Sequence, residues 1–250
     1  MKVIHRLRRI PGYLSRKFIS VSGSKEYKKF IIISRSRSGS FLLITLLDSH
    51  PAIEAKGELF VRLNGRSCKE VWKETFCRKQ RKIKYVGFKL FYYHPVDSSD
   101  REVWNFILND PSIRIIHLTR NNLLRTIVSR KIAAKTEVWR QLQKENLSIE
   151  DKKVEIAYDE CLAEFKKTKN WEYETEIRFK DHPYLQITYE ELTDERENTM
   201  RRIFRFLEME DYPVSTPMVK QNNEPLSDLI INYDALVTSL KQTEWAHFVE

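Results

Sequence analysis

The chain has 250 residues, which is enough for one domain of moderate size with its own core. Hydrophobic residues make up 41% and aromatic residues 12% of the chain, a composition that excludes an intrinsically disordered protein. Lys and Arg number 44 against 35 Asp and Glu, and the resulting charge of +9 favours anionic partners: nucleic acids, phosphorylated ligands, acidic glycans or anionic membranes.

The first 25 residues are predicted to form a basic arm, and residues 26–250 a single domain. The arm carries charges throughout and lacks the apolar stretch of a signal peptide, and no run in the chain reaches the ~20 apolar residues that span a bilayer. We expect a solvated arm, with peripheral contact to a membrane surface as the alternative. The three cysteines lack CxxC spacing and favour neither disulfides nor a zinc site, so we expect a cytoplasmic protein.

Strands and helices alternate along the chain. Short apolar or alternating runs predict strands at residues 28–34, 53–55, 84–92, 112–119 and 184–189. Apolar side chains at helical spacing predict helices in residues 41–49, 104–108, 121–134, 200–207 and 233–240. Ser148–Asp151 resembles a capping box that opens one more helix, with an apolar stripe from Val154 to Phe165. This order predicts an α/β fold, a mainly parallel sheet flanked by helices, with ligands beyond the carboxyl ends of the strands.

The turn between the first strand and the first helix is predicted to bind an anion. Its sequence is SRSRSGSF, residues 34–41. A helix N-terminus attracts phosphate or sulfate through its N–H groups and partial positive charge. Gly39 permits close backbone approach, Ser38 and Ser40 add hydroxyl donors, and Arg37 adds a forked guanidinium. The turn is not a Walker A loop, because it lacks the second glycine and the lysine. A serine-rich turn that only caps the helix is the alternative.

Residues 30–60, FIIISRSRSGSFLLITLLDSHPAIEAKGELF, resemble the 5′-phosphosulfate loop of sulfotransferases. The likeness is strongest to the bacterial branch that sulfates carbohydrates and nodulation-type glycolipids. It implies a P-loop-like α/β fold and 3′-phosphoadenosine 5′-phosphosulfate (PAPS) as the donor. Arg37–Ser40 match the family pattern Lys/Arg-Ser-Gly-Ser/Thr, which implies that Arg37 contacts the bridging oxygen of the leaving group. Phe41 is expected to border the same donor site.

Residues 115–130, IIHLTRNNLLRTIVSR, resemble the 3′-phosphate motif of the same family. Arg120 follows a predicted strand, and Ser129 comes nine positions later on the next helix. The resemblance implies that both hold the 3′-phosphate, the group that distinguishes this donor from ATP. The better-known spacing between the arginine and the serine is eight, which would put Val128 at the serine position. The sequence pattern TRxNLLR nonetheless fits the carbohydrate branch, which has the longer spacing. A helix start with a salt-bridged arginine is the alternative.

A carboxylate is the predicted base, because transfer to a hydroxyl requires removal of its proton. Glu58 follows the short strand at 53–55, and the resemblance implies that it is the base, with Phe60 as a neighbouring wall. His50 and His94, each followed by proline, are the rival bases.

Two lysines complete the candidates. Lys89, in a predicted strand, points either into the site or to solvent, and the sequence favours neither orientation. Lys220 lies in a C-terminal segment that also resembles the family, which implies a contact to the 3′-phosphate. The ITYEEL stretch, residues 187–192, resembles a family element for which we expect a structural role.

The sequence therefore predicts a sulfotransferase that moves a sulfuryl group from PAPS to a hydroxyl of a carbohydrate or glycolipid. Fixed cationic and N–H donors supply what Mg²⁺ supplies in a kinase, so no metal is expected. A P-loop-like phosphotransferase is the first alternative. A basic nucleic-acid-binding protein is the second, and we expect no nucleic-acid partner because most aromatic residues fall at core spacing and the basic residues are dispersed.

Overall fold

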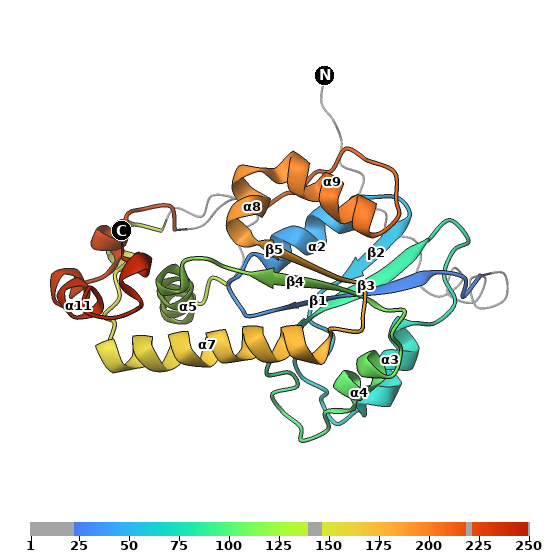
Figure 1. Cartoon of the computed structure of the whole chain (residues 1–250), viewed down its shortest axis with the longest axis horizontal. Coiled ribbons are helices and arrows are strands. Elements are labelled where there is room, and N and C mark those ends of the chain that lie inside the picture. Colours follow the sequence, from blue (N-terminus) through green and yellow to red (C-terminus); the bar gives the residue numbers. More distant parts are fainter. Residues whose placement is uncertain (1–22, 140–146, 219–221, 250) are drawn as a thin grey trace.

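The computed structural model describes residues 23–139, 147–218 and 222–249 (Figure 1). Most of the predicted basic arm therefore lies outside the described residues. Within the described part, every helix is too short or too polar to cross a membrane.

Five parallel strands form the central sheet, in the order β2-β3-β1-β4-β5. Their bounds are Lys28–Ser34 for β1, Ile53–Lys56 for β2, Tyr85–Phe91 for β3, Arg114–Thr119 for β4 and Tyr184–Thr188 for β5. Each predicted strand is present, within two residues at either end. The prediction of a mainly parallel α/β sheet is thus confirmed.

Helices cover both faces of this sheet (Figure 1). On one face lie α2 (Ser40–Asp48), α8 (Tyr189–Asp194) and α9 (Arg196–Phe206), which share a core with alternate residues of the strands. On the other face lie α3 (Cys68–Thr75), α4 (Glu102–Leu108) and the end of α7 (Tyr158–Arg178). Both faces of the strands are therefore buried, which explains their nearly continuous apolar sequences.

A third core lies beyond the carboxyl ends of the strands. It joins α5 (Leu123–Thr136) and the first half of α7 to α10 (Leu226–Leu229), α11 (Tyr233–Leu240) and a short 3-10 turn at Ala246–Phe248. In Figure 1 this cluster occupies the end of the molecule next to the C-terminus. It stands opposite the strand ends, where ligands of parallel sheets bind.

The strand order creates a crevice between β1 and β4. The connection after β1 runs towards β2, whereas the connection after β4 runs the other way, towards β5. Where neighbouring strands send their connections in opposite directions, their carboxyl ends leave room for a ligand. Both predicted phosphate-binding segments follow these two strands.

The helix predicted from Ser148 is interrupted. The capping box is present, but it opens only the single turn of α6 (Ile149–Lys152). Val154 then donates its N–H to Leu229 and accepts from Ile231 through its backbone oxygen, at 2.9 and 3.0 Å. Since these backbone groups are committed to another segment, the helix cannot continue, and α7 begins separately at Tyr158.

Candidate functional site

Gly39, in the turn between β1 and α2, is closely approached by an aromatic ring. Gly39 is the N-cap of α2 and has a left-handed backbone with φ of 80°. A Cβ at this position would lie 2.4 Å from Cδ2 of Tyr189, the first residue of α8. Glycine is therefore required both by the backbone conformation and by the neighbouring ring. Gly39 has no capping side chain, and the positive end of the α2 dipole faces this edge of the sheet.

The two serines of the turn have different surroundings. Ser38 is 2% exposed, and its hydroxyl donates to the backbone oxygen of Arg35 at 2.9 Å, so this side chain stabilises the turn itself. The hydroxyl oxygen of Ser40 lies 3.4 Å from Nζ of Lys89. Of the two hydroxyl donors predicted in the turn, Ser40 is the one that lies beside a charged side chain, that of Lys89.

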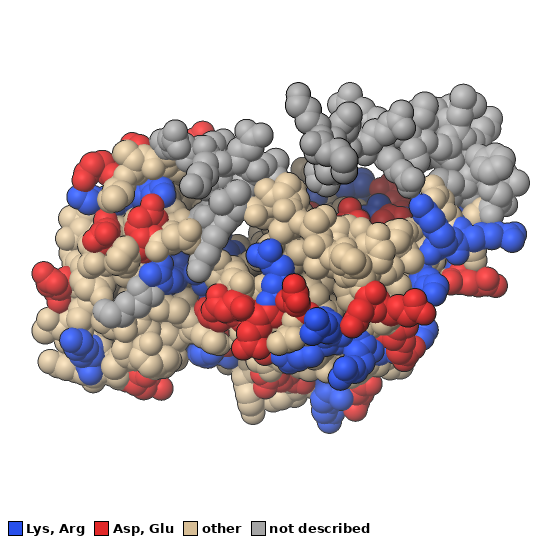
Figure 2. Space-filling model, turned by 90° about the horizontal axis from the view of Figure 1, so that it is seen from above, with Lys and Arg blue, Asp and Glu red and all other residues tan. Residues whose placement is uncertain are grey.

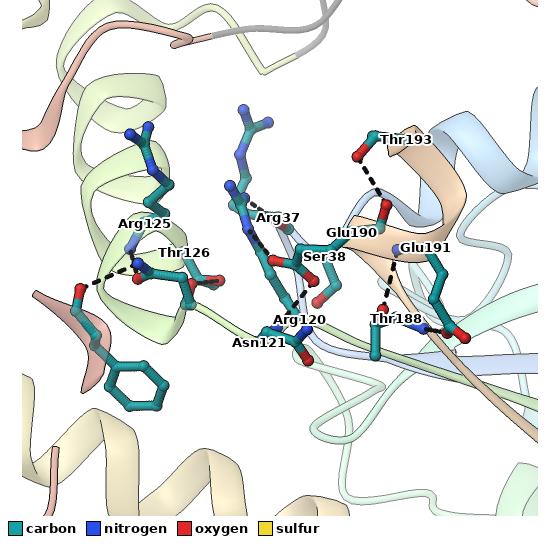
Figure 3. A network of polar contacts seen from close by, with 12 residues as sticks. Arg37, Ser38, Arg120, Asn121, Arg125, Thr126, Thr188, Glu190, Glu191 and Thr193 are labelled. Atoms are coloured by element: carbon teal, nitrogen blue, oxygen red, sulfur yellow. Dashed lines mark hydrogen bonds and ion pairs between the residues drawn. The ribbon is translucent and has the colours of Figure 1, made fainter. Parts of the chain in front are cut away.

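Arg37 and Arg120 lie side by side, although 83 positions separate them in the sequence (Figure 3). Arg120 follows β4 and donates from Nη1 to the backbone oxygen of Arg37 at 3.0 Å. Its guanidinium packs over Tyr189, 4.5 Å from the ring centroid. Glu190 lies 4.0 Å from Arg120 Nε and accepts from the Asn121 N–H at 3.0 Å, so α8 orients the arginine. The two predicted basic segments thus share one site.

The Arg37 side chain extends from the turn towards α5. Its Nε donates to Oγ of Ser129 at 2.9 Å, and its Nη1 donates to the backbone oxygen of Trp139 at 2.7 Å. Burial, with the charge of Arg120 as a smaller cause, lowers the pKa of Arg37 to about 10. Neighbouring guanidinium groups that disfavour one another's charge are stabilised by an anion, so this pair is a candidate phosphate site.

Ser129, nine positions after Arg120, presents its hydroxyl to this site. The neighbouring Val128 is 1% exposed and packs in the third core. Asn222 Nδ2 lies 3.4 Å from Ser129 Oγ on the opposite side. A small cavity is lined by Arg120, Arg125, Ser129 and Asn222, among others. The longer of the two spacings considered from the sequence is therefore the one that brings a hydroxyl to the arginine pair.

Glu58 lies just beyond β2 and forms an ion pair with Lys89, whose Nζ is 2.8 Å from Oε1. Lys89 belongs to β3 and is 2% exposed. Its Nζ lies 5.3 Å from the ring centroid of Phe41 and 5.2 Å from that of Phe91. The sequence left two orientations of Lys89 open, and the structure has the inward one. Through its contacts to Glu58 and Ser40, this lysine connects the candidate base with the first anion turn.

The two rival histidines have less favourable positions. His50 precedes β2, at the amino edge of the sheet, and packs edge-on against Tyr212 with ring centroids 4.7 Å apart. His94 follows β3 at the carboxyl edge, but it is fully buried and accepts from the N–H of Phe91 through Nδ1 at 3.3 Å. Burial lowers the pKa of His94 to about 4. Glu58, with a side chain 23% exposed, is the group of the three that combines the carboxyl edge with access to solvent.

Arg35 anchors the anion turn to the helices beside it. It is 3% exposed, donates to the Thr168 hydroxyl and pairs with the carboxylate of Glu164, both on α7. Arg130 of α5 contacts the same carboxylate at 3.0 Å. Arg35 therefore ties the turn before Arg37 to α7, and Arg130 ties α5 to the same carboxylate.

Several residues of the site were not predicted from the sequence. Arg125 and Asn222 line the cavity, and Tyr189 and Glu190 fix Arg120. The ITYEEL stretch contains the last two, so the structural role expected for it includes shaping the arginine site. Lys220, predicted at the 3′-phosphate, lies outside the described residues, two positions before Asn222.

Seen from above, a hollow separates the C-terminal helices from the side of the molecule that carries α8 and α9, and Lys and Arg side chains lie in it (Figure 2). Elsewhere on this face, acidic and basic side chains of the described residues are intermixed. A nucleic-acid-binding protein concentrates its positive charge in a stripe or patch. The basic side chains visible on this face are instead scattered among acidic ones.

The chain is similar to several known proteins. The profile of the sulfotransferase family matches residues 106–213, which include Arg120 and Ser129. Nodulation protein H of Rhizobium tropici is 26% identical over 196 residues, covering 71% of this chain and 74% of the relative. Nodulation protein H of Rhizobium meliloti (strain 1021) is 22% identical over 240 residues, covering 88% of this chain and 94% of the relative. A crystal structure of a sulfotransferase from Alicyclobacillus acidocaldarius superimposes with a TM-score of 0.45 and 16% identity, covering 87% of this chain and 95% of that one. Residues 106–213 therefore match the sulfotransferase family, and most of the chain is similar to nodulation protein H.

Proposed function

We propose that this protein is a sulfotransferase that takes its sulfuryl group from PAPS and transfers it to a hydroxyl of a carbohydrate or glycolipid. One observation supports the donor above all others: Arg120 donates to the backbone oxygen of Arg37 at 3.0 Å. The segments that resemble the 5′-phosphosulfate and 3′-phosphate sites therefore adjoin each other. A nucleotide with charged groups at both its 5′ and 3′ positions needs such a pair of sites.

The residues present fit that donor. Arg37, Arg120 and Ser129 form one connected group, and Arg125 lines the cavity beside them. We assign the 3′-phosphate to Arg120 and Ser129, and the 5′-phosphosulfate to Ser40 and the first turn of α2. Arg37 lies between the two sites and contributes positive charge to both. Bound phosphate would offset the burial and the repulsion from Arg120 that lower the pKa of Arg37.

Glu58 is the proposed general base. As the acceptor oxygen forms its bond to sulfur, its proton passes to the Glu58 carboxylate, while the bond between sulfur and the donor's phosphate oxygen breaks and adenosine 3′,5′-bisphosphate leaves. Lys89 Nζ, 2.8 Å from Glu58 and 3.4 Å from Ser40, positions this carboxylate beside the leaving group. Preformed cations and N–H groups stabilise the charge that develops on the departing phosphate.

The resemblance of residues 30–60 to the carbohydrate-sulfating branch supports a sugar hydroxyl as the acceptor. The three cysteines are free thiols, which fits a reducing compartment, and we propose the cytoplasm as the site of the reaction.

The donor assignment can be tested by calorimetric titration. Adenosine 3′,5′-bisphosphate should bind about 100-fold more tightly than 5′-AMP, because only the former offers a 3′-phosphate to charged donors. Arg120→Ala should remove most of that difference, and Arg37→Ala should slow turnover by about 10²–10³. Arg205→Ala, at an exposed position of α9, is the control and should change neither quantity. Tighter binding of ATP with Mg²⁺ would instead support a kinase and contradict the proposal.

A further inference from the structure

A second hollow lies next to the catalytic residues, where the segment after β3 meets α4 and the end of α7. Its volume is about 450 Å³, and its walls include Tyr93, Trp104, Asn105 and Arg178. This volume lies within the range of about 300–1,000 Å³ that is typical of small-molecule sites. The proposed donor site does not use any of these side chains.

We infer that this groove binds sugar units adjacent to the sulfated one, so that the acceptor is an oligosaccharide rather than a single sugar. The inference rests on the proposed function, since it assigns the groove to the acceptor of that reaction. It specifies which part of the molecule selects acceptors by their length.

The groove borders the proposed catalytic site through Tyr93, which lies two residues beyond the end of β3 and forms one wall. The Tyr93 ring lies 5.7 Å from that of Phe91, and the Phe91 ring lies 5.2 Å from Nζ of Lys89, the partner of Glu58. The backbone oxygen of Tyr93 accepts from Nη1 of Arg101, another wall residue, at 2.9 Å. A chain of sugars with one hydroxyl at Glu58 would therefore meet Tyr93 next.

The lining combines ring faces with fixed hydrogen-bond donors. The Tyr93 ring packs against Trp171 with centroids 5.7 Å apart, and the Arg178 guanidinium lies 5.6 Å from the centroid of Trp104. Arg101 and Asn105 are exposed at the rim. Sugar rings present apolar C–H faces and many hydroxyl oxygens, which match aromatic walls and guanidinium or amide donors.

This composition favours sugar over lipid as the occupant. Among the walls, Leu108 is the exposed aliphatic side chain, at 36%, and the others are aromatic, amide or cationic. An acyl chain would have to bury its length against charged groups, at a cost in desolvation. A glycolipid would therefore place its sugar portion, and not its acyl chain, in this groove.

The test uses the protein loaded with donor and three pairs of acceptors: N-acetylglucosamine with chitotetraose, glucose with cellotetraose, and glucose with maltotetraose. Asn105→Trp fills the groove from an exposed position of α4. For the tetrasaccharide that the parent sulfates best, kcat/KM should fall about tenfold or more through KM, as expected for loss of a pocket contact. The monosaccharide should be unaffected. Asn109→Trp, at the exposed end of the same helix, is the matched control and should behave like the parent.

A binding measurement makes the outcome independent of turnover. With adenosine 3′,5′-bisphosphate bound, the tetrasaccharides are titrated while the tryptophan indole signals are followed by NMR. Binding that shifts indole signals of the parent and is weakened by Asn105→Trp supports the inference. Equal kcat/KM values for short and long acceptors, or tetrasaccharide binding that Asn105→Trp leaves intact, would overturn it, as would absence of binding by all three. Failure to bind adenosine 3′,5′-bisphosphate would instead refute the proposed function.

Discussion

Replacing Glu58 by alanine should both destabilise the protein and slow turnover, and the two effects can be separated. The substitution leaves the ammonium of Lys89 buried, 2% exposed, beside a hydroxyl at 3.4 Å and two aromatic rings. Removing one partner of a buried ion pair costs about 3–5 kcal/mol, because the other charge is left without compensation. Since the Glu58 side chain is 23% exposed and water reaches the pair, we expect the lower end of this range.

The double variant Glu58→Ala/Lys89→Met distinguishes stability from catalysis. Replacing both charges by apolar groups should recover most of the lost free energy of unfolding, because the desolvated ammonium is gone. Turnover of both the single and the double variant should be about 10²–10⁴-fold below that of the parent, which is the usual contribution of a general base. Urea unfolding followed by circular dichroism gives the first quantity, and transfer of labelled sulfate from PAPS gives the second.

A second ion pair, between β2 and the segment that joins α3 to β3, provides the control. Glu54, at the other end of β2, lies 2.7 Å from the ammonium of Lys79, which is 7% exposed. Glu54→Ala should cost stability on the same scale, but it should leave kcat of the folded enzyme near the parent value. The reasoning would be refuted if Glu58→Ala unfolded at the urea concentration of the parent, or if the double variant regained turnover.

Two further predictions concern the anion turn and the sheet. Gly39→Ala adds a methyl group 2.4 Å from the Tyr189 ring at a φ of 80°, whereas Gly65→Ala adds one at the same φ in open space. In chemical denaturation, Gly39→Ala should therefore lose about 1–3 kcal/mol more stability than Gly65→Ala. Gly39→Ala should also weaken binding of adenosine 3′,5′-bisphosphate. Burial lowers the pKa of His117 from 6.5 to about 4, so the unfolded chain binds a proton that the folded protein does not, and stability should fall as the pH drops from about 6.5 to 4. The difference in unfolding free energy between pH 7 and 4.5 should shrink in His117→Gln, by up to about 3 kcal/mol. Equal losses for the two alanine variants, or an unchanged pH difference in His117→Gln, would contradict these arguments.

The sheet and the two basic segments could be predicted because their signals are local. A β-branched run such as residues 28–34 reads as a buried strand wherever it lies, and an arginine at a strand tip needs no distant partner to be recognised. The orientation of Lys89 could not be predicted, since all seven residues of β3 are buried and the strand carries no polar alternation. The other features could not be predicted because they depend on long-range contacts. The helix predicted from Ser148 ends after α6 because Val154 pairs with Ile230, and glycine is needed at position 39 because of the Tyr189 ring.

The length of α7 sets the width of the crevice. Its early residues Cys161 and Phe165 pack in the third core, Thr168 holds Arg35, and Phe179, just after its last turn, packs under the sheet. A helix of 21 residues spans about 30 Å and resists compression, so it acts as a rigid spacer between two separately packed bodies. Relatives in which the helix equivalent to α7 is shorter or longer would hold the sheet and the C-terminal helices at a different separation. The crevice between them would then suit ligands of a different size.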